Sequence, residues 1–153
     1  MPISEGGNEM ASVDDVAAAV LARLRPLDTW KLQKLVYYCQ AWHLVWEGEP
    51  LFQEEIEAWA NGPVVPALYQ KHKGQFRVST WPSGDPDRLS ESEDSTIEAV
   101  LDHYGKMPGH VLAALTHRED PWRRARGSLP PGARGNAEIT WESMASYYLS
   151  LVP

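Results

Sequence analysis

The sequence feature that most constrains the fold is a helical run that is apolar on nearly all of its sides. Residues 31–48 read KLQKLVYYCQAWHLVWEG, and only Gln33, Gln40 and Glu47 leave a polar edge along the predicted helix. A helix with so much apolar surface normally lies at the centre of its domain. Gly48 supplies the C-terminal stop of this helix. The sequence therefore predicts a central helix around which the other elements pack.

The segment after this helix predicts a short β element and a tight turn. Residues 52–61 alternate partly between apolar and polar side chains, which favours a short strand. Asn61-Gly62-Pro63 is a turn signal, and Pro66 suits the first turn of a new helix. Residues 76–81 are expected to form a second short strand that pairs with the first.

Capping residues predict where most of the other helices begin. Ser12 with Asp15 and Ser90 with Glu93 form capping boxes, and Thr140 is placed to cap the last helix. Asp120-Pro121 is interpreted as an N-cap followed by a first-turn proline. We therefore expect a mainly α protein: a single compact helical domain of about six helices, with a small β element near residues 52–81.

Length and composition narrow the class of protein. A chain of 153 residues with 43% apolar residues and seven tryptophans suits one folded domain. Residues 1–11 are interpreted as a flexible leader without the apolar stretch of a signal peptide, and residues 12–153 as the domain. The presence of only one cysteine fits a reducing cytoplasm. The sequence contains no uncharged apolar run of about 18 residues, so no membrane span is predicted. The net charge of −7 disfavours general nucleic-acid binding.

Several short motifs in a fixed order resemble one known family, and the similarity extends from Val13 to Leu151. The motifs are a KLQKL-type helix start, a GxPLF turn, an AW pair, a GPVxP turn and an LTHxExPW segment. The matching positions are Lys31 to Leu35, Tyr37, Tyr38, Gln40, His43, Leu44, Gly48 to Phe52, Ile56, Ala58, Trp59, Gly62 to Val64, Pro66, Leu68, Tyr69, Leu115 to His117, Glu119, Pro121 and Trp122. In this order the motifs resemble the SocA-like or Panacea antitoxin domain, which also occurs in phage-associated GepA-type proteins.

The resemblance implies an antitoxin that binds and neutralises a cognate protein toxin, typically encoded by an adjacent gene. Members of this family are paired with toxins of unrelated kinds, so the shared scaffold has to present a variable binding surface. We interpret the motif residues as scaffold: Lys31, Leu32, Gln33, Lys34, Tyr37, His43, Trp59, Gly62, Pro63, Tyr69, His117, Pro121 and Trp122. Trp59 and Trp122 are expected to lock the fold around the Gly62-Pro63 turn.

Residues that suggest enzymatic or metal chemistry have simpler interpretations. His103, His110 and His117 are seven residues apart, but Gly105 and Pro108-Gly109 interrupt the helix between the first two. Neither HExxH nor a Cys/His pair at zinc spacing occurs. We expect no metal, no cofactor and no catalytic set.

Two further groups were weighed as catalytic residues. Cys39 and His43 share a helix face, yet their apolar neighbours favour an inert buried thiol and a hydrogen-bonded core histidine. A solvent-exposed acidic edge is a better interpretation than an acid–base pair for Glu54, Glu55 and Glu57. An enzyme is therefore not expected.

The candidate partner-binding residues are an arginine cluster and one tryptophan. Arginines concentrate in a short stretch at Arg118, Arg123, Arg124, Arg126 and Arg134. Trp81, in a loop-like stretch, is predicted to be an exposed interface anchor. The loops at residues 81–89 and 127–137 are expected to carry recognition. The arginine cluster also leaves open an alternative function, a DNA-binding transcriptional regulator acting through Arg118 to Arg134.

Overall fold

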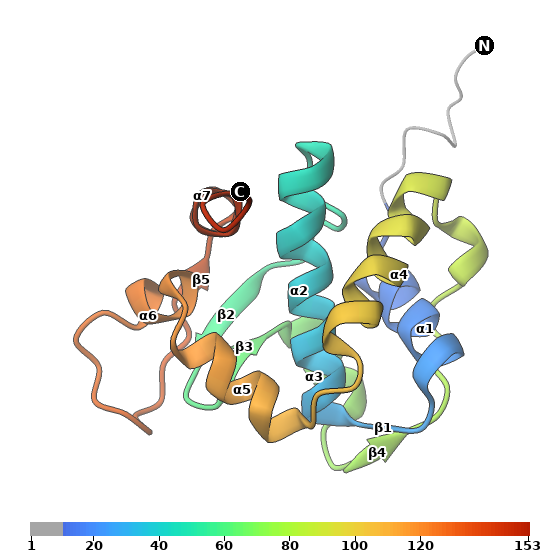
Figure 1. The fold of residues 1–153 in the computed structure, drawn as a ribbon. Helices are drawn as coiled ribbons and strands as arrows, with labels where there is room; N and C mark the ends of the chain where they lie inside the picture. The colour runs from blue at the N-terminus through green and yellow to red at the C-terminus, as the bar shows by residue number, and fades with distance from the viewer. Residues whose placement is uncertain (1–10) are drawn as a thin grey trace.

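The central helix α2 (Thr29–Glu47) is surrounded by the other elements of the fold (Figure 1). The computed structural model describes residues 11–153. Helices α1 and α4 lie on one side of α2, and α7 and a small sheet lie on the other. The helices of the described residues are α1 (Val13–Leu24), α2 (Thr29–Glu47), α3 (Pro66–His72), α4 (Glu91–Tyr104), α5 (Gly109–His117), α6 (Asp120–Arg126) and α7 (Trp141–Leu149), with a 3-10 turn η2 (Pro86–Arg88). The predicted mainly α, single compact domain is confirmed, with seven helices among residues 11–153.

Local capping explains where the helices begin and end. The Ser12/Asp15 and Ser90/Glu93 capping boxes start α1 and α4, and the Thr140 side chain caps α7, as predicted. Asp28 caps α2, and Gly48 ends it with a φ of +76°. The N-cap of α6 is Glu119, without a side-chain cap bond, so the prediction that Asp120 caps this helix is wrong.

The strands form two small antiparallel sheets. One contains β3 (Gly62–Val64), β2 (Ile56–Trp59) and β5 (Glu138–Ile139) in that order. The other pairs β1 (Leu27–Asp28) with β4 (Arg77–Val78). The prediction that residues 76–81 pair with residues 52–61 is therefore wrong. β2 pairs instead with β5 and with β3, the strand that begins at the predicted turn, and β2 and β3 form a hairpin.

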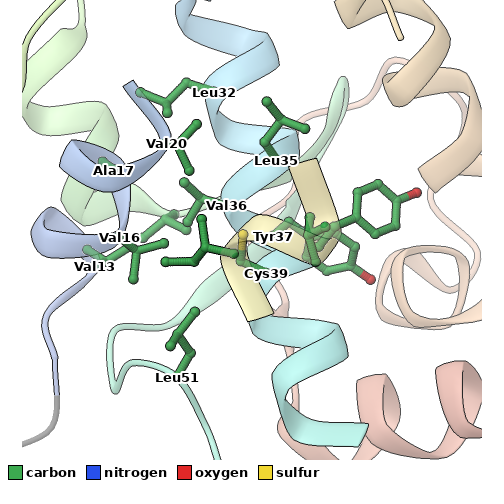
Figure 2. Packing of buried hydrophobic residues seen from close by; sticks show 14 of the residues in the cluster. Val13, Val16, Ala17, Val20, Leu32, Leu35, Val36, Tyr37, Cys39 and Leu51 are labelled. Atoms are coloured by element: carbon green, nitrogen blue, oxygen red, sulfur yellow. The ribbon is translucent and has the colours of Figure 1, made fainter. Parts of the chain in front are cut away.

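The hydrophobic core surrounds α2, and one part of it lies between α1 and α2. Figure 2 shows Val16 and Val20 of α1 close to Val36 of α2, with Cys39 and Leu51 continuing the same buried cluster. All five side chains are essentially inaccessible to solvent. Burial of this much apolar surface is the main stabilising contribution to the fold.

The predicted polar edge of the central helix is partly buried. Gln33 and Gln40 are fully buried, while Glu47 is exposed. The Gln40 carboxamide accepts from the main-chain N–H of Leu51 (2.6 Å) and donates to the carbonyl of Phe52 (2.7 Å). A buried carboxamide satisfied in this way fixes the chain that follows α2.

The predicted leader falls largely outside the described residues, and the first described one, Ala11, is buried. Within residues 11–153, no helix combines the length and the apolar character that a membrane crossing requires.

Candidate functional site

Gln33 of α2 holds the segment that follows the β2–β3 hairpin. Its side chain accepts from the main-chain N–H of Val65 (2.8 Å) and donates to the Val65 carbonyl (3.2 Å). The same amide nitrogen lies 3.0 Å from Nε2 of His72, which therefore has to act as the acceptor. Burial lowers the pKa of His72, so this ring stays neutral. The contacts join α2 to both ends of α3.

Lys34 is the most unusual residue in this region. Its side chain is 1% exposed, and its Nζ has no hydrogen-bond partner among residues 11–153. The Nζ lies 5.3 Å from the centre of the Trp30 ring. Burial lowers the pKa of Lys34 to about 8, although the negative charge of Asp28 acts in the opposite direction. An unpaired buried amine destabilises a fold, so Lys34 is a candidate functional group.

Gly62 allows the hairpin to approach Lys34. Its φ is +122°, and a Cβ at this position would lie 2.6 Å from Cε of Lys34 and 3.2 Å from Oγ1 of Thr116. Both the backbone angle and the space therefore require glycine. Lys34 lies directly behind the turn between β2 and β3.

His117 and Trp122 pack against each other beside the β2–β3 hairpin. Their rings are stacked with centres 4.1 Å apart, and Nε1 of Trp122 donates to the carbonyl of Trp59 (2.8 Å). Nε2 of His117 is buried and has no hydrogen-bond partner in the described part of the chain, and burial lowers the pKa of this ring. The guanidinium carbon of Arg126 lies 5.3 Å from the centre of the Trp122 ring.

Glu119 is a buried carboxylate held by tyrosines. The hydroxyls of Tyr38 and Tyr148 each donate to its Oε1 at 2.7 Å. Tyr37 extends this network, with its hydroxyl 3.0 Å from that of Tyr148. Burial raises the pKa of Glu119, and the two hydroxyl donors oppose that rise. Because the carboxylate is used in this way, it does not cap α6.

The surface next to these residues has two clefts. The Trp30–Trp59 cleft, about 530 Å³, is bounded by α2, the β2–β3 hairpin and the end of the 127–137 loop. Its lining residues are Trp30, Glu57, Trp59, Ala60, Asn61, Arg134, Gly135 and Asn136. The α6–α7 cleft, about 460 Å³, is lined by residues that include Asp120, Arg124, Glu138, Ser143 and Tyr147. The 127–137 loop contributes lining residues to the first cleft, and it connects α6 to β5, which both line the second.

Comparison with known proteins decides the family. A family model described as "Antitoxin SocA-like, Panacea domain" matches residues 32–123, which include α2, the hairpin, Glu119 and Trp122. The chain belongs to this family.

A relative supports the same assignment. The chain is 30% identical over 111 residues to a protein named "Antitoxin SocA" from Caulobacter vibrioides (strain NA1000 / CB15N). The match covers 63% of this chain and 58% of that relative. No solved structure matches the chain significantly.

The motif residues of this Panacea domain are mostly buried between elements. Gln33, Lys34, Tyr37, Gly62, Pro63 and His43 are all buried, and Nδ1 of His43 lies 2.8 Å from Oγ1 of Thr96, as expected of a core histidine. The half-buried motif residues form the edge of this region: Lys31, Trp59, Tyr69, His117 and Trp122. Leu32 lies in the core, and Pro121 starts α6. These positions support their interpretation as scaffold.

Two of the candidate partner-binding residues are not on the surface. Trp81 is only 6% exposed and donates from Nε1 to a carboxylate oxygen of Asp14 (2.8 Å), so the prediction of an exposed anchor is wrong. The large apolar ring is buried against α1 instead. Arg126 is 5% exposed and donates to the carbonyls of Ala58, Pro130 and Ala133 at 3.3, 3.2 and 2.8 Å. It holds the 127–137 loop and is not part of an exposed patch.

The other arginines of the predicted cluster are exposed but separate. Arg118 follows α5, and Arg123 and Arg124 lie on α6, where Asp120 is 4.0 and 3.7 Å from their guanidinium groups. Arg134 lines the Trp30–Trp59 cleft. None of the ion pairs among residues 11–153 involves Arg134.

The cysteine and two of the glutamates that were considered as catalytic residues are held in structural contacts. Burial raises the pKa of the Cys39 thiol, which keeps it protonated and unreactive. Glu57 accepts from Nε1 of Trp59 (2.8 Å), and Glu54 accepts from the main-chain N–H of Val13 (3.1 Å). In the described part of the chain, no group of three or more His, Cys, Asp or Glu residues is arranged to hold a metal ion.

The sequence interpretation missed the role of Trp30 and the Tyr38–Glu119–Tyr148 network. Trp30 is four residues before Lys34 on α2, and this spacing places both side chains on one helix face. That spacing was a usable signal for the contact between Trp30 and Lys34. The tyrosine network joins residues 81 and 29 positions apart, so no local pattern indicates it.

Proposed function

We propose that this protein is an antitoxin of the cytoplasm that neutralises a cognate protein toxin by binding it directly. The observation that carries the proposal is membership of the SocA-like Panacea family, supported by the similarity to a protein named as an antitoxin. The toxin is expected from an adjacent gene, as is typical of toxin–antitoxin pairs.

A non-enzymatic role fits the way in which the motif side chains are used. Gln33, Glu119 and Trp122 make hydrogen bonds that hold α2, α6, α7 and the β2–β3 hairpin together. A scaffold of this kind supplies a rigid base on which surface residues recognise a partner. Recognition is then assigned to exposed residues next to the scaffold.

The contact surface includes the 127–137 loop and the exposed arginines Arg118, Arg123, Arg124 and Arg134. Arginine is enriched at protein interfaces because its guanidinium combines charge, planar hydrogen bonding and an apolar face. The 81–89 loop is a weaker candidate, since Trp81 and the main-chain N–H of Asp85 bind carboxylates of α1.

The test is expression of the neighbouring reading frame with and without this protein, followed by co-purification. We expect growth arrest by the neighbour alone, rescue on co-expression, and elution of both proteins as one complex. A harmless neighbour, or rescue without a complex, contradicts direct neutralisation. In that case, salt-dependent binding to duplex DNA through the exposed arginines becomes the next hypothesis to measure.

A further inference from the structure

Two aromatic rings from separate elements line the Trp30–Trp59 cleft, and a third ring packs against both of them. Trp30 belongs to the start of α2, Trp59 to β2, and Tyr69 of α3 connects them from behind. The ring centres of Trp30 and Tyr69 are 6.1 Å apart, and those of Trp59 and Tyr69 are 5.0 Å apart. All three side chains are half-buried, so each keeps an accessible part. Rigid, partly exposed aromatic rings are typical anchors of protein interfaces.

The charges around this cleft favour an anionic occupant. Arg134 is exposed on the rim, and the unpaired amine of Lys34 lies behind Trp30 and the hairpin turn. The one carboxylate among the lining residues is Glu57, whose negative charge offsets only one of these two cations. The exposed carboxamides of Asn61 and Asn136 add hydrogen-bond donors on the rim. This cleft is therefore locally positive on a protein whose net charge is −7.

The α6–α7 cleft lacks this combination. Its arginine, Arg124, lies 3.7 Å from Asp120, and Glu138 is a second carboxylate in the lining. One arginine against two carboxylates gives that cleft a net negative charge. Trp30 and Trp59 belong only to the other cleft, which therefore offers both the unpaired positive charge and the aromatic surface.

We propose that the Trp30–Trp59 cleft is the docking site for an acidic segment of the toxin. A carboxylate of that segment pairs with Arg134 and the neighbouring asparagine amides, while an apolar or aromatic neighbour packs on Trp30 and Trp59. This assignment rests on the proposed antitoxin function and specifies the partner chemistry of its binding surface. The buried amine of Lys34 contributes positive potential from below, which explains why an unpaired lysine is kept in the scaffold.

The experiment measures binding of the purified protein to the product of the adjacent gene by isothermal titration calorimetry. Arg134→Glu should weaken binding by about tenfold or more, because it places a like charge opposite the carboxylate. Asn136→Asp, an isosteric change on the exposed rim, should weaken it severalfold for the same reason. Lys34→Met should also weaken binding severalfold, although it removes an unpaired buried charge from the fold.

The matched control is Arg25→Glu, which makes the same charge change at an exposed position at the end of α1, outside every proposed contact surface. Its affinity should equal that of the unsubstituted protein. The assignment is overturned if Arg134→Glu or Lys34→Met binds as tightly as the unsubstituted protein, or if Arg25→Glu loses as much affinity as Arg134→Glu. Failure of the unsubstituted protein to bind the neighbour contradicts the proposed function itself, and the cleft assignment falls with it.

Discussion

Replacing Lys34 by methionine should stabilise the protein and change how its stability depends on pH. The Lys34 amine is buried without a hydrogen-bond partner, and its pKa is lowered from 10.5 to about 8. Methionine has a similar length and no charge, so Lys34→Met removes the cost of holding a desolvated ammonium group. A lowering of about 2.5 in pKa corresponds to roughly 3 kcal/mol. At neutral pH we expect the variant to be more stable by on the order of 1–3 kcal/mol.

The sign of the pH effect follows from proton binding. Between the folded pKa and the unfolded pKa, the unfolded state binds more protons at Lys34 than the folded state does. Stability due to this residue therefore rises with pH across this window, by about 2 kcal/mol between about pH 7 and pH 9.5. The raised pKa values of the buried Cys39 and tyrosine side chains act in the opposite direction at alkaline pH. Both proteins share those groups, so the difference between them isolates Lys34.

Urea unfolding followed by tryptophan fluorescence measures the effect. The stability advantage of Lys34→Met should shrink by about 2 kcal/mol from about pH 7 to pH 9.5. A difference between the two proteins that stays constant with pH would refute the argument, since it would mean that the Lys34 amine is solvated in the folded state.

Three further changes test other contacts. Gln33→Ala should cost about 2–4 kcal/mol, because it leaves the N–H and carbonyl of Val65 buried and unsatisfied, whereas Gln53→Ala at an exposed position should be nearly neutral in urea unfolding. Arg126→Met should release the carbonyls of Ala58, Pro130 and Ala133, so limited proteolysis should cut the 127–137 loop faster; unchanged cleavage would contradict this role. Reversal of Arg123 and Arg124 to glutamate should weaken toxin binding while circular dichroism stays native, and unchanged affinity would remove these two residues from the contact surface.

Local signals explain which parts of the fold the sequence predicted. Capping residues such as Ser12, Ser90 and Thr140 act on the main chain within three residues, so they mark helix starts without knowledge of the fold. Gly48 marks the end of α2 in the same local way. The apolar character of residues 31–48 also indicated correctly that α2 is central.

The wrong predictions depend on distant contacts. Residues 77–78 pair with Leu27–Asp28 in a two-residue ladder, which is too short to have a sequence pattern of its own. Trp81 is buried because Asp14, 67 residues away, accepts its indole N–H. Arg126 is buried because one carbonyl of β2 and two of the 127–137 loop converge on it. A loop-like neighbourhood or a cluster of arginines cannot indicate such partners.

For the candidate site too, local motifs could be recognised from the sequence, whereas contacts between distant residues could not. The motif order identified the family, and the family model confirms that assignment. The Trp30–Trp59 cleft is assembled from α2, the β2–β3 hairpin and the 127–137 loop, so its geometry emerges only in the folded chain.

The most direct test of direct neutralisation is reconstitution from purified components. The activity of the toxin is measured while this protein is added in increasing amounts, with no other cellular protein present. Direct neutralisation predicts that toxin activity disappears as the two proteins reach equal concentrations, and that Arg134→Glu requires a large excess to achieve the same inhibition. Full toxin activity at equal concentrations, with inhibition restored only by cell extract, would contradict the account.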